Sequence, residues 1–383
     1  MKKHKQAQLV HATSWVELYK NAFEHNISQY KKVIGDKILA PVIKSNAYGH
    51  GLTEIAQLCQ QNEKIAWLCV ATLSESLKLR EIGITKPVII LTPIGPHTEK
   101  AIIQDISVTA YNLDTICYLD SCGKQIGKPC KIHIKIDTGL SRLGVKVSEA
   151  LELIKKVKTF EHITIEGIWT HFAESQSSNR SFTNEQVKKF NKLIENLLEI
   201  GIKIPLVHVS NSAGATTVTS PYANLVRVGI GIYGYWPSEY VKHETGKKYP
   251  NFTLKPILTW KTKIVDIKYI PTGTFVGYSR TYIAKKESKI AILPIGYFDG
   301  YDIRLSNKGF VIIKGMYAPV IGRICMNLIA VDTTDLQNVN IGDEVILVGE
   351  HPKINATDIS NLTEMNPREV TTKIHPEIPR IVI

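Results

Sequence analysis

Eight short apolar runs recur through residues 38–233, and they constrain the fold more than any other feature of the chain. The runs occupy 38–43, 66–72, 87–92, 107–111, 131–137, 163–170, 206–210 and 225–233. Helical patterns separate most of them, at 74–82, 97–105, 115–126, 148–160 and 184–200. Strands that are apolar on both faces and alternate with helices are typical of a parallel sheet covered by helices. About eight such repeats predict a (β/α)8 barrel.

A doubly wound open sheet is the alternative, but no G-x-G-x-x-G follows any of these runs. After about residue 250 the pattern changes to β-branched runs separated by Gly, Asn and Asp turns, which predicts an antiparallel β domain. We therefore expect a barrel over 14–245 and a β domain over 246–383, joined by a linker at 236–250. Residues 11–18 are predicted to form a strand. This strand, over residues from about 9 to 18, could belong to the β domain. A helix is predicted at 20–33.

Composition excludes several classes of function. The net charge is +12, but the lysines are scattered, with no basic stripe interleaved with aromatic residues, so we expect no nucleic-acid partner. No apolar run reaches the length of a membrane span, and no apolar segment of signal-peptide length follows the basic start. The six cysteines form no C-x-x-C pair, which is typical of reduced cytoplasmic thiols. We expect a cytoplasmic protein without a membrane or metal partner.

In a barrel of this kind the active site lies at the carboxyl ends of the strands. The polar residues at or just after the ends of the runs are Lys44, Tyr48, Lys135, Asp137, Arg142, His171, Asn211, Ser212, Arg227 and Gly229. They include cations, a histidine, an amide and a hydroxyl, but no carboxylate cluster. That argues against a divalent metal and against hydrolases with paired carboxylates, and it favours an anionic ligand. Glycine and serine after the last two runs suit a phosphate group.

A lysine and a phosphate site at one barrel mouth predict a Schiff base between Lys44 and pyridoxal phosphate (PLP). Each residue alone has a commoner structural explanation. His171 would be a satisfied strand-end histidine, Arg142 or Arg227 a surface or ion-paired residue, and Asn211-Ser212 a helix N-cap. Their joint occurrence at successive strand ends favours the functional interpretation.

The segment 42–51, VIKSNAYGHG, resembles the PLP-lysine motif of the alanine racemases. The resemblance continues in the same order along nearly the whole chain, at 136–144, 170–173, 211–214, 226–230, 277–282, 296–300 and 322–327. It implies a homodimer with active sites shared between subunits.

The resemblance also implies roles for individual residues. Lys44 would bind PLP covalently and act as one catalytic base, while Tyr278 of a second copy would act on the opposite face. His171, bonded to Arg227, would bias that tyrosine towards ionisation, and Arg227 would face the pyridine nitrogen. Arg142 would contact the cofactor's phenolic oxygen and the substrate carboxylate. The remaining expected contacts are Tyr48, Asn211, Ser212, Gly229 and Ile230 for the cofactor and Met326 for the substrate carboxylate.

Several positions depart from the family pattern. Asn327 replaces a usual aspartate, and Gln176 stands where an acidic residue is common. Arg368 occupies the place of a tyrosine that caps the phosphate, so we expect this arginine to bind phosphate. Arg304 comes one place later than the family's arginine, and Lys135 occupies the position of a lysine that the family often carries in carbamylated form. These differences concern the substrate corridor more than the PLP site.

The resemblance implies an alanine racemase that interconverts L- and D-alanine and supplies D-alanine for peptidoglycan. A serine or broad-spectrum amino-acid racemase is the first alternative, because of Asn327, Arg368 and Gln176. An amino-acid decarboxylase of the same architecture is less favoured, since that group pairs the PLP nitrogen with a carboxylate and this chain offers Arg227. A non-catalytic PLP-binding module would resemble the barrel alone, without the β domain that carries Tyr278 and Met326.

Overall fold

The computed structural model describes residues 13–383, which fall into two compact units. The barrel unit comprises residues 22–45 and 55–255, and the β unit comprises the remaining described residues, 13–21, 46–54 and 256–383. The predicted boundary between residues 245 and 246 stays a prediction. The basic start of the chain and the first part of the strand predicted at 11–18 lie outside the described residues.

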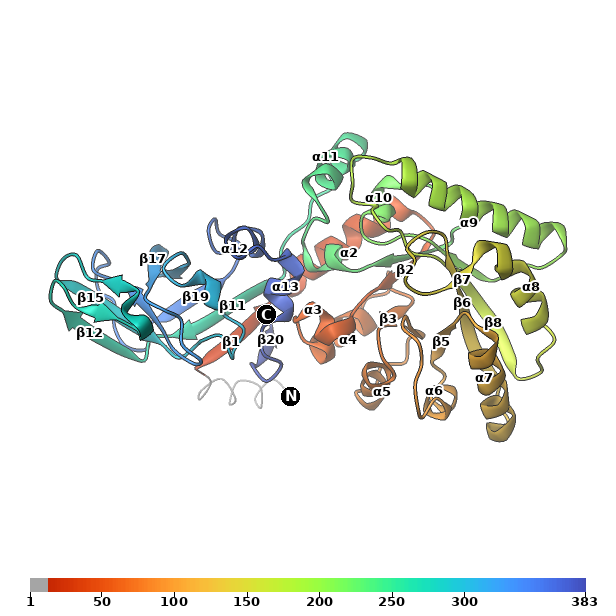
Figure 1. Cartoon of the computed structure of the whole chain (residues 1–383), viewed down its shortest axis with the longest axis horizontal. Coiled ribbons are helices and arrows are strands. Elements are labelled where there is room, and N and C mark those ends of the chain that lie inside the picture. The colour runs from red at the N-terminus through yellow and green to blue at the C-terminus, as the bar shows by residue number, and fades with distance from the viewer. Residues whose placement is uncertain (1–12) are drawn as a thin grey trace. The chain divides into compact units, whose positions relative to one another are not determined.

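Eight parallel strands form the sheet of the barrel unit (Figure 1): β2 (Ile38–Pro41), β3 (Leu68–Val70), β4 (Val88–Ile90), β5 (Ser107–Ala110), β6 (Cys130–Asp137), β8 (Ile163–Trp169), β9 (Leu206–His208) and β10 (Leu225–Val228). Strands β3 to β9 pair in chain order, β10 pairs with β2, and a bridge between Val42 and Cys69 joins β2 to β3. A short strand, β7 (Val145–Lys146), pairs in parallel with the last residues of β6. The backbone N–H of Asn224 donates to Val207 O at 3.0 Å, which links β9 to β10. The sheet therefore curls on itself, and the predicted barrel is confirmed.

Helices alternate with these strands, and Figure 1 shows α5 to α9 on the outside of the sheet. The helices are α2 (Lys20–Ile34), α3 (Lys44–Tyr48), α4 (Leu52–Gln61), α5 (Leu73–Glu81), α6 (Glu99–Ile103), α7 (Leu113–Ile126), α8 (Val147–Val157), α9 (Ser181–Glu199), α10 (Gly214–Thr217), α11 (Glu239–Lys248) and the 3-10 turn η1 (Ile230–Tyr233). Local sequence sets their ends. Thr72 and Glu75 form a capping box on α5, and Gly127 ends α7 with a φ of 73°.

The segment predicted as a linker, 236–250, contains helix α11 (Glu239–Lys248), and its role as a linker stays a prediction. Ser238 caps this helix by accepting a hydrogen bond from Val241 N at 3.2 Å. The segment is rich in charged residues and buries only Val241 and Thr245. It therefore lacks the apolar stripe by which an amphipathic helix is recognised in a sequence.

The β unit is built on a nine-stranded sheet with the order β12-β15-β18-β17-β16-β19-β11-β1-β20. Its strands are β1 (Ser14–Leu18), β11 (Leu258–Lys263), β12 (Asp266–Ile270), β15 (Ser288–Leu293), β16 (Phe310–Ile313), β17 (Met316–Ile321), β18 (Ile329–Asp332), β19 (Glu344–Val348) and β20 (Arg380–Val382). All neighbours are antiparallel except β1 and β20. The predicted antiparallel domain is confirmed. Strand β1 pairs with β11 from Ser14 opposite Thr262 to Leu18 opposite Leu258.

Smaller elements complete the β unit. A hairpin of β13 (Phe275–Val276) and β14 (Tyr282–Ile283) carries the 3-10 turn η2 (Tyr278–Arg280) at its tip. The unit also contains η3 (Ile303–Leu305), α12 (Ala356–Thr363) and α13 (Pro367–Thr372). Within residues 13–383, no helix is both long and apolar enough to cross a membrane.

Candidate active site

Lys44 lies immediately after the carboxyl end of β2, and its backbone is held on both sides. Val42 N donates to Val228 O, and Ile43 N donates to Cys69 O, each at 2.8 Å, so both neighbouring strands fix the approach to the lysine. The next peptide is held by a carboxylate, because Ser45 N donates to Glu75 Oε1 at 2.5 Å. These bonds place a half-buried amine at the barrel mouth, as the sequence predicted.

The turn that follows Lys44 has an unusual backbone. Four consecutive non-glycine residues, 45–48, have φ between 52° and 55°, in the left-handed region. This conformation costs about 1–2 kcal/mol per residue, so the surroundings must hold it. Asn46 contributes twice: its carbonyl accepts from Gly51 N at 2.9 Å, and its side chain accepts from Leu52 N at 2.8 Å. The motif therefore encodes a strained turn as well as a lysine.

Gly49 belongs to the same turn and has a φ of 85°. A Cβ at this position would lie 1.9 Å from Thr371 O, so no larger residue fits. The carbonyl of Gly49 accepts hydrogen bonds from Arg380 Nη2 at 2.9 Å and Nε at 3.2 Å. Within the β unit, the last strand thus fixes the end of the turn.

Several cations gather at the barrel mouth. The Lys135 Nζ lies 4.3 Å and the Arg227 Cζ 4.6 Å from the centroid of the Trp169 ring. Burial lowers the pKa of Lys135 to about 8, and the charges of Arg142, Arg227 and Lys44 act in the same direction. This excess of positive charge favours binding of an anionic group.

Arg227 is as buried as Lys135, with 2% of its surface exposed. Its Nη1 donates to His208 Nδ1 at 2.6 Å, and its Nη2 donates to Thr170 O at 2.8 Å and faces His171 Nδ1 at 3.5 Å. Burial lowers the pKa of Arg227 to about 10, so it remains charged at neutral pH. The predicted pair of His171 and Arg227 is present, although the contact is long.

His171 is neutral at physiological pH. Burial, and then the charge of Arg227, lowers its pKa to about 3. Since a guanidinium can only donate, the Nδ1 that faces Arg227 is the acceptor. The proton of His171 therefore resides on Nε2, which is available as a hydrogen-bond donor to another group.

Ser212 and the glycines after β10, which the sequence predicted to bind phosphate, are linked by hydrogen bonds, and their binding role stays a prediction. The Ser212 Oγ accepts from Gly229 N at 3.0 Å and from Gly231 N at 3.3 Å. Gly231 has no room for a side chain, since a Cβ there would lie 2.0 Å from the hydroxyl of Tyr30. Ser212, Gly229 and Ile230, which begins η1, thus lie together at the ends of β9 and β10.

Asn211 has a structural role next to this group. Its Oδ1 accepts from Gly214 N at 2.9 Å and from Ser175 Oγ at 3.0 Å, which holds the loop just before the short helix α10. The N-cap residue of α10 itself is Ala213, so the ordinary N-cap explanation does not apply to Asn211 there. Any contact between Asn211 and a cofactor stays a prediction.

The turn after β6 presents Arg142. Asp137 Oδ1 accepts from Gly139 N at 2.9 Å and from Ser141 N at 3.1 Å, which closes the turn just before the arginine. The Arg142 side chain is exposed, yet its charge acts on both Lys135 and His171. The barrel unit thus brings Lys44, Arg142, His171 and Arg227 within electrostatic reach of one another.

The other predicted site residues belong to the β unit. Tyr278 stands on η2 with 70% of its surface exposed, next to Gly277 (φ 74°) and Ser279 (φ 58°). Met326 is also exposed, and its carbonyl accepts from Phe298 N at 3.0 Å. Their roles, like that of Tyr48, stay predictions.

The residues that depart from the family pattern make contacts of their own. The Asn327 Nδ2 donates to Asp299 Oδ2 at 3.4 Å, so the amide is tied to a neighbouring loop. Gln176 is exposed on the barrel unit, and its carbonyl accepts from Ser238 Oγ at 2.8 Å.

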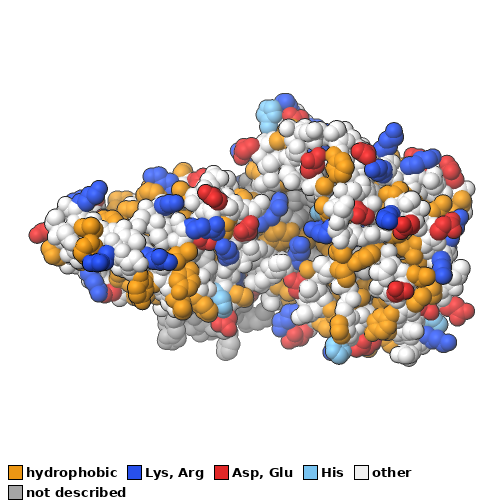
Figure 2. All heavy atoms as spheres, viewed as in Figure 1, with side chains coloured by type: hydrophobic (Ala, Val, Ile, Leu, Met, Phe, Trp, Pro, Cys, Tyr) orange, Lys and Arg blue, Asp and Glu red, His pale blue; other side chains and the backbone are white. Residues whose placement is uncertain are grey.

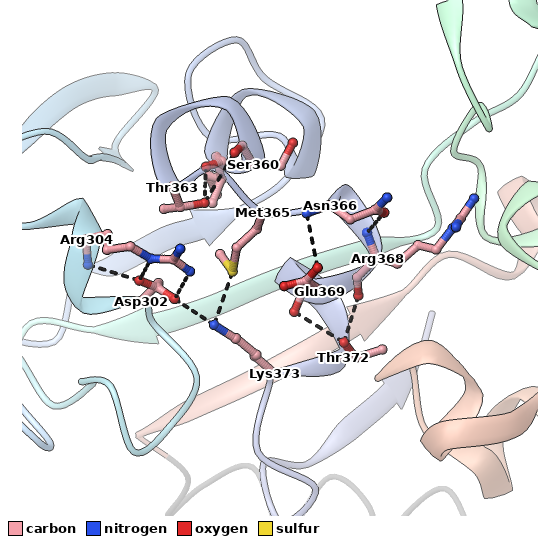
Figure 3. A network of polar contacts seen from close by, with 11 residues as sticks. Asp302, Arg304, Ser360, Thr363, Met365, Asn366, Arg368, Glu369, Thr372 and Lys373 are labelled. Carbon is pink, nitrogen blue, oxygen red and sulfur yellow. Dashed lines mark hydrogen bonds and ion pairs between the residues drawn. The ribbon is translucent and has the colours of Figure 1, made fainter. Parts of the chain in front are cut away.

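Arg368 lies in the first turn of α13 (Figure 3). Its backbone N–H donates to Asn366 Oδ1 at 3.0 Å. Nearby, Asp302 binds Arg304 Nε at 2.9 Å and Lys373 Nζ at 2.8 Å, and the hydrogen bond from Arg304 is the main cause that holds the pKa of Asp302 well below its usual range. Figure 3 shows the guanidinium of Arg368 extending away from this cluster. Arg368 is therefore available for another partner, and its role stays a prediction.

Sequence reasoning missed Trp169, His133 and Glu75. His133 could have been found, because it lies two residues before Lys135 on one strand and so shares its face. No sequence pattern indicates that Trp169 would lie against two cations or that Glu75 would bind the peptide after Lys44.

The donor set fits PLP in its chemistry. The barrel unit contains an amine suited to bind an aldehyde and hydroxyl and N–H groups suited to bind a phosphate. It also contains a guanidinium suited to contact a ring nitrogen. Among residues 13–383, no group of three or more His, Cys, Asp or Glu side chains could hold a metal ion.

Comparison with known proteins agrees with this chemistry. Residues 19–237 match the family "Alanine racemase, N-terminal domain", and residues 257–382 match "Alanine racemase, C-terminal domain". The chain belongs to the alanine racemase family. A relative is alanine racemase 2 of Caldanaerobacter subterraneus subsp. tengcongensis, 39% identical over 374 residues, which are 96% of this chain and 94% of the relative.

Solved alanine racemase structures share the fold. The enzyme of Clostridium difficile 630 superposes with a TM-score of 0.92 at 33% identity, over 98% of this chain and 96% of the other. That of Bacillus anthracis, described with bound L-Ala-P, gives 0.87 at 30% identity over 97% and 95%. That of Bartonella henselae, described with covalently bound pyridoxal phosphate, gives 0.82 at 28% identity over 97% and 100%. Alanine racemases of this family therefore bind PLP.

Proposed function

We propose that this chain is a PLP-dependent alanine racemase that interconverts L- and D-alanine. The observation that carries the proposal is the position of Lys44, an amine at the end of β2 within reach of Arg142, His171 and Arg227. Family membership gives this arrangement its reaction. Supply of D-alanine for peptidoglycan, from a cytoplasmic enzyme, is the role that the family resemblance implies.

PLP, when bound, withdraws electrons from the substrate Cα and makes its hydrogen acidic. Lys44 would hold the aldehyde carbon, and Ser212, Gly229 and Ile230 would hold the phosphate. The resemblance adds Tyr48, Asn211 and Arg368 to the cofactor contacts. The members of this set in the barrel unit would hold the cofactor next to Lys44.

Arg227 would contact the pyridine nitrogen. A guanidinium has no acceptor and stays charged at neutral pH, so it keeps a proton off that nitrogen. The consequence is a weaker electron sink than a carboxylate partner would give. This property supports racemisation over decarboxylation, as the strand-end arginine already indicated.

Racemisation needs one base on each face of the substrate Cα. Lys44 would move the proton on one face, and Tyr278 of a second copy would move it on the other. A tyrosine with a reference pKa of about 10 must be made more acidic for this role. The neutral His171, with its proton on Nε2, can donate to the phenolate oxygen and so stabilise it.

A homodimer is part of the proposal. The strong exposure of Tyr278 supports a role outside its own protomer, because nothing in the β unit buries its ring. Figure 2 shows further hydrophobic side chains at the surface of the β unit. The exposed members include Tyr269, Phe275, Ile283, Phe298 and Leu328. Such a surface suits a second copy of the chain.

The substrate carboxylate would bind Arg142 and Met326. A broader amino-acid racemase is the second candidate, because Asn327, Gln176 and Arg368 replace family residues. A panel of L-alanine, L-serine and L-lysine separates the two. We expect the highest kcat/KM for alanine, and faster turnover of serine or lysine would favour the alternative.

Lys135 should be modified by carbon dioxide. Its pKa of about 8 leaves about a tenth of the amine uncharged at pH 7, and this fraction rises with pH. The free amine adds to CO2 and releases one proton, which yields a carbamate whose negative charge offsets the surrounding cations. We expect 13C-labelled bicarbonate to give a carbamate resonance that grows between about pH 6 and 8.

The control for this experiment lies on the same strand. Lys135→Arg should abolish the resonance, whereas Lys131→Arg should retain it, since Lys131 is paired with Asp105 at 2.8 Å at the surface. A resonance that survives Lys135→Arg would disprove the assignment.

A further inference from the structure

A chain of buried polar side chains runs behind Arg227, away from the cofactor site. Arg227 Nη1 donates to His208 Nδ1 at 2.6 Å, and His208 Nε2 lies 2.9 Å from His133 Nδ1. His133 Nε2 in turn lies 3.2 Å from Glu166 Oε2. Both histidine rings are fully buried, and the four side chains come from β10, β9, β6 and β8.

The direction of every hydrogen bond in this chain is determined. Since Arg227 can only donate, His208 Nδ1 must accept, and the proton of His208 therefore resides on Nε2. That proton is donated to His133 Nδ1, which places the proton of His133 on Nε2, facing Glu166. One carboxylate and one guanidinium thus impose the same tautomer on two histidines.

Charge and burial keep the two rings neutral. Burial, and then the Arg227 charge, holds the pKa of His208 well below its usual range, and burial likewise lowers the pKa of His133. Burial alone would raise the pKa of Glu166, but hydrogen bonds from His133 and Ser107 bring it below the usual value. The carboxylate therefore stays ionised and the rings stay uncharged near neutral pH.

The backbone is shaped to hold this chain. The ladder between β6 and β8 shifts so that Ile132 pairs with Ile165 but His133 pairs with Gly167, which leaves Glu166 as the extra residue of a bulge. Bulges change the direction in which a side chain points and are frequent near active sites. A Cβ at Gly167 would lie 2.2 Å from His133 Nδ1, so only glycine leaves room for the ring.

We propose that Glu166 is a positioning residue for the racemase reaction, acting through His133 and His208 to hold Arg227 against the pyridine nitrogen of PLP. The inference rests on the proposed function, because it requires bound PLP. Without the carboxylate, His133 loses the acceptor that fixes its tautomer. His208 can then present an N–H to Arg227, which turns the guanidinium away from the ring nitrogen and loosens its contact with His171.

The test compares Glu166→Leu with Ser107→Ala in the holoenzyme. The leucine variant keeps the approximate size of the side chain but removes both oxygens, so His133 Nε2 loses its acceptor; a glutamine would still offer an amide oxygen. The alanine variant removes the other donor to the same carboxylate without touching the histidines. Two signals are recorded by 15N NMR: the ring nitrogens of labelled histidine and the pyridine nitrogen of labelled PLP. Neither signal depends on turnover.

In the unmodified protein we expect His133 and His208 as Nε2–H tautomers and the pyridine nitrogen without a proton. Glu166→Leu should change the tautomers, shift the pyridine signal towards the protonated form and lower kcat/KM about 10- to 100-fold, the usual size for the loss of an orienting partner. Ser107→Ala should change none of these by a comparable amount.

Two results would overturn the inference. The first is an Nδ1–H tautomer of His208 in the unmodified protein. This measurement does not require any variant to fold. Unchanged 15N signals in a folded Glu166→Leu variant would show that the carboxylate does not position the histidines. Failure of the proposed function is distinguishable, since a protein that binds PLP with these tautomers but does not racemise alanine would contradict the activity alone.

Discussion

Replacing Lys44 with alanine is expected to lower the rate of alanine racemisation by on the order of 10⁴-fold, at the upper end of what a single proton-transfer group contributes. The substitution removes both the covalent attachment of PLP and one of the two bases. The half-buried side chain lies at the barrel mouth rather than in the core, so the fold should survive. The loss should therefore appear in chemistry and not in thermal stability.

The attachment itself can be measured. Borohydride reduction of the holoenzyme followed by peptide mass spectrometry should place the cofactor on Lys44, and the Lys44→Ala protein should carry none. Lys78→Ala is a matched control, because Lys78 is an exposed lysine of the barrel unit paired only with Glu81 at the surface. Full activity in Lys44→Ala, or reduction that labels another lysine, would contradict the proposed mechanism.

Tyr278→Phe has the second largest expected effect. It removes one hydroxyl from an exposed side chain, so stability should change by less than about 0.5 kcal/mol. Racemisation should fall by roughly 10²- to 10⁴-fold because one face of the substrate loses its base. In deuterated water, exchange of the α-hydrogen should persist for one enantiomer of alanine and collapse for the other.

The control for this variant is Tyr269→Phe, since Tyr269 is equally exposed in the same unit. Equal loss of exchange for both enantiomers in Tyr278→Phe would show that the tyrosine is not a base specific to one face.

The shared site can be tested with the same two variants. A mixed dimer of Lys44→Ala and Tyr278→Phe chains contains one site with both defects and one intact site. Random mixing should therefore restore about a quarter of the unmodified activity, since about half of the dimers are mixed. No recovery after mixing would place both residues in one protomer and contradict the shared site.

The sequence predicts the barrel well because its strands are buried on both faces, and such runs are apolar throughout. All eight predicted runs contain a parallel strand, from β2 to β10. Helix α11 was missed for the opposite reason: it buries only two residues, and a cap at Ser238 is a weak signal by itself. The left-handed turn at 45–48 was also unpredictable, because apolar periodicity carries no information on the sign of φ.

The site residues also divide into those that the sequence could predict and those that it could not. Lys44, Arg142, His171, Ser212 and Arg227 were accessible because topology alone brings strand ends to one mouth. The chain from Arg227 to Glu166 was not, because it depends on a bulge that turns a mid-strand glutamate towards His133. The alternation of side chains along a strand predicts which face of the sheet that glutamate lies on. It cannot reveal the extra residue of a bulge.

Racemisation is tested most directly by the conversion of L-alanine by the purified protein with PLP in deuterated water. We expect D-alanine that carries deuterium at Cα, and the reverse conversion when D-alanine is supplied. A protein that binds PLP yet forms no D-alanine, or that instead releases carbon dioxide from an amino acid, would contradict the proposed function.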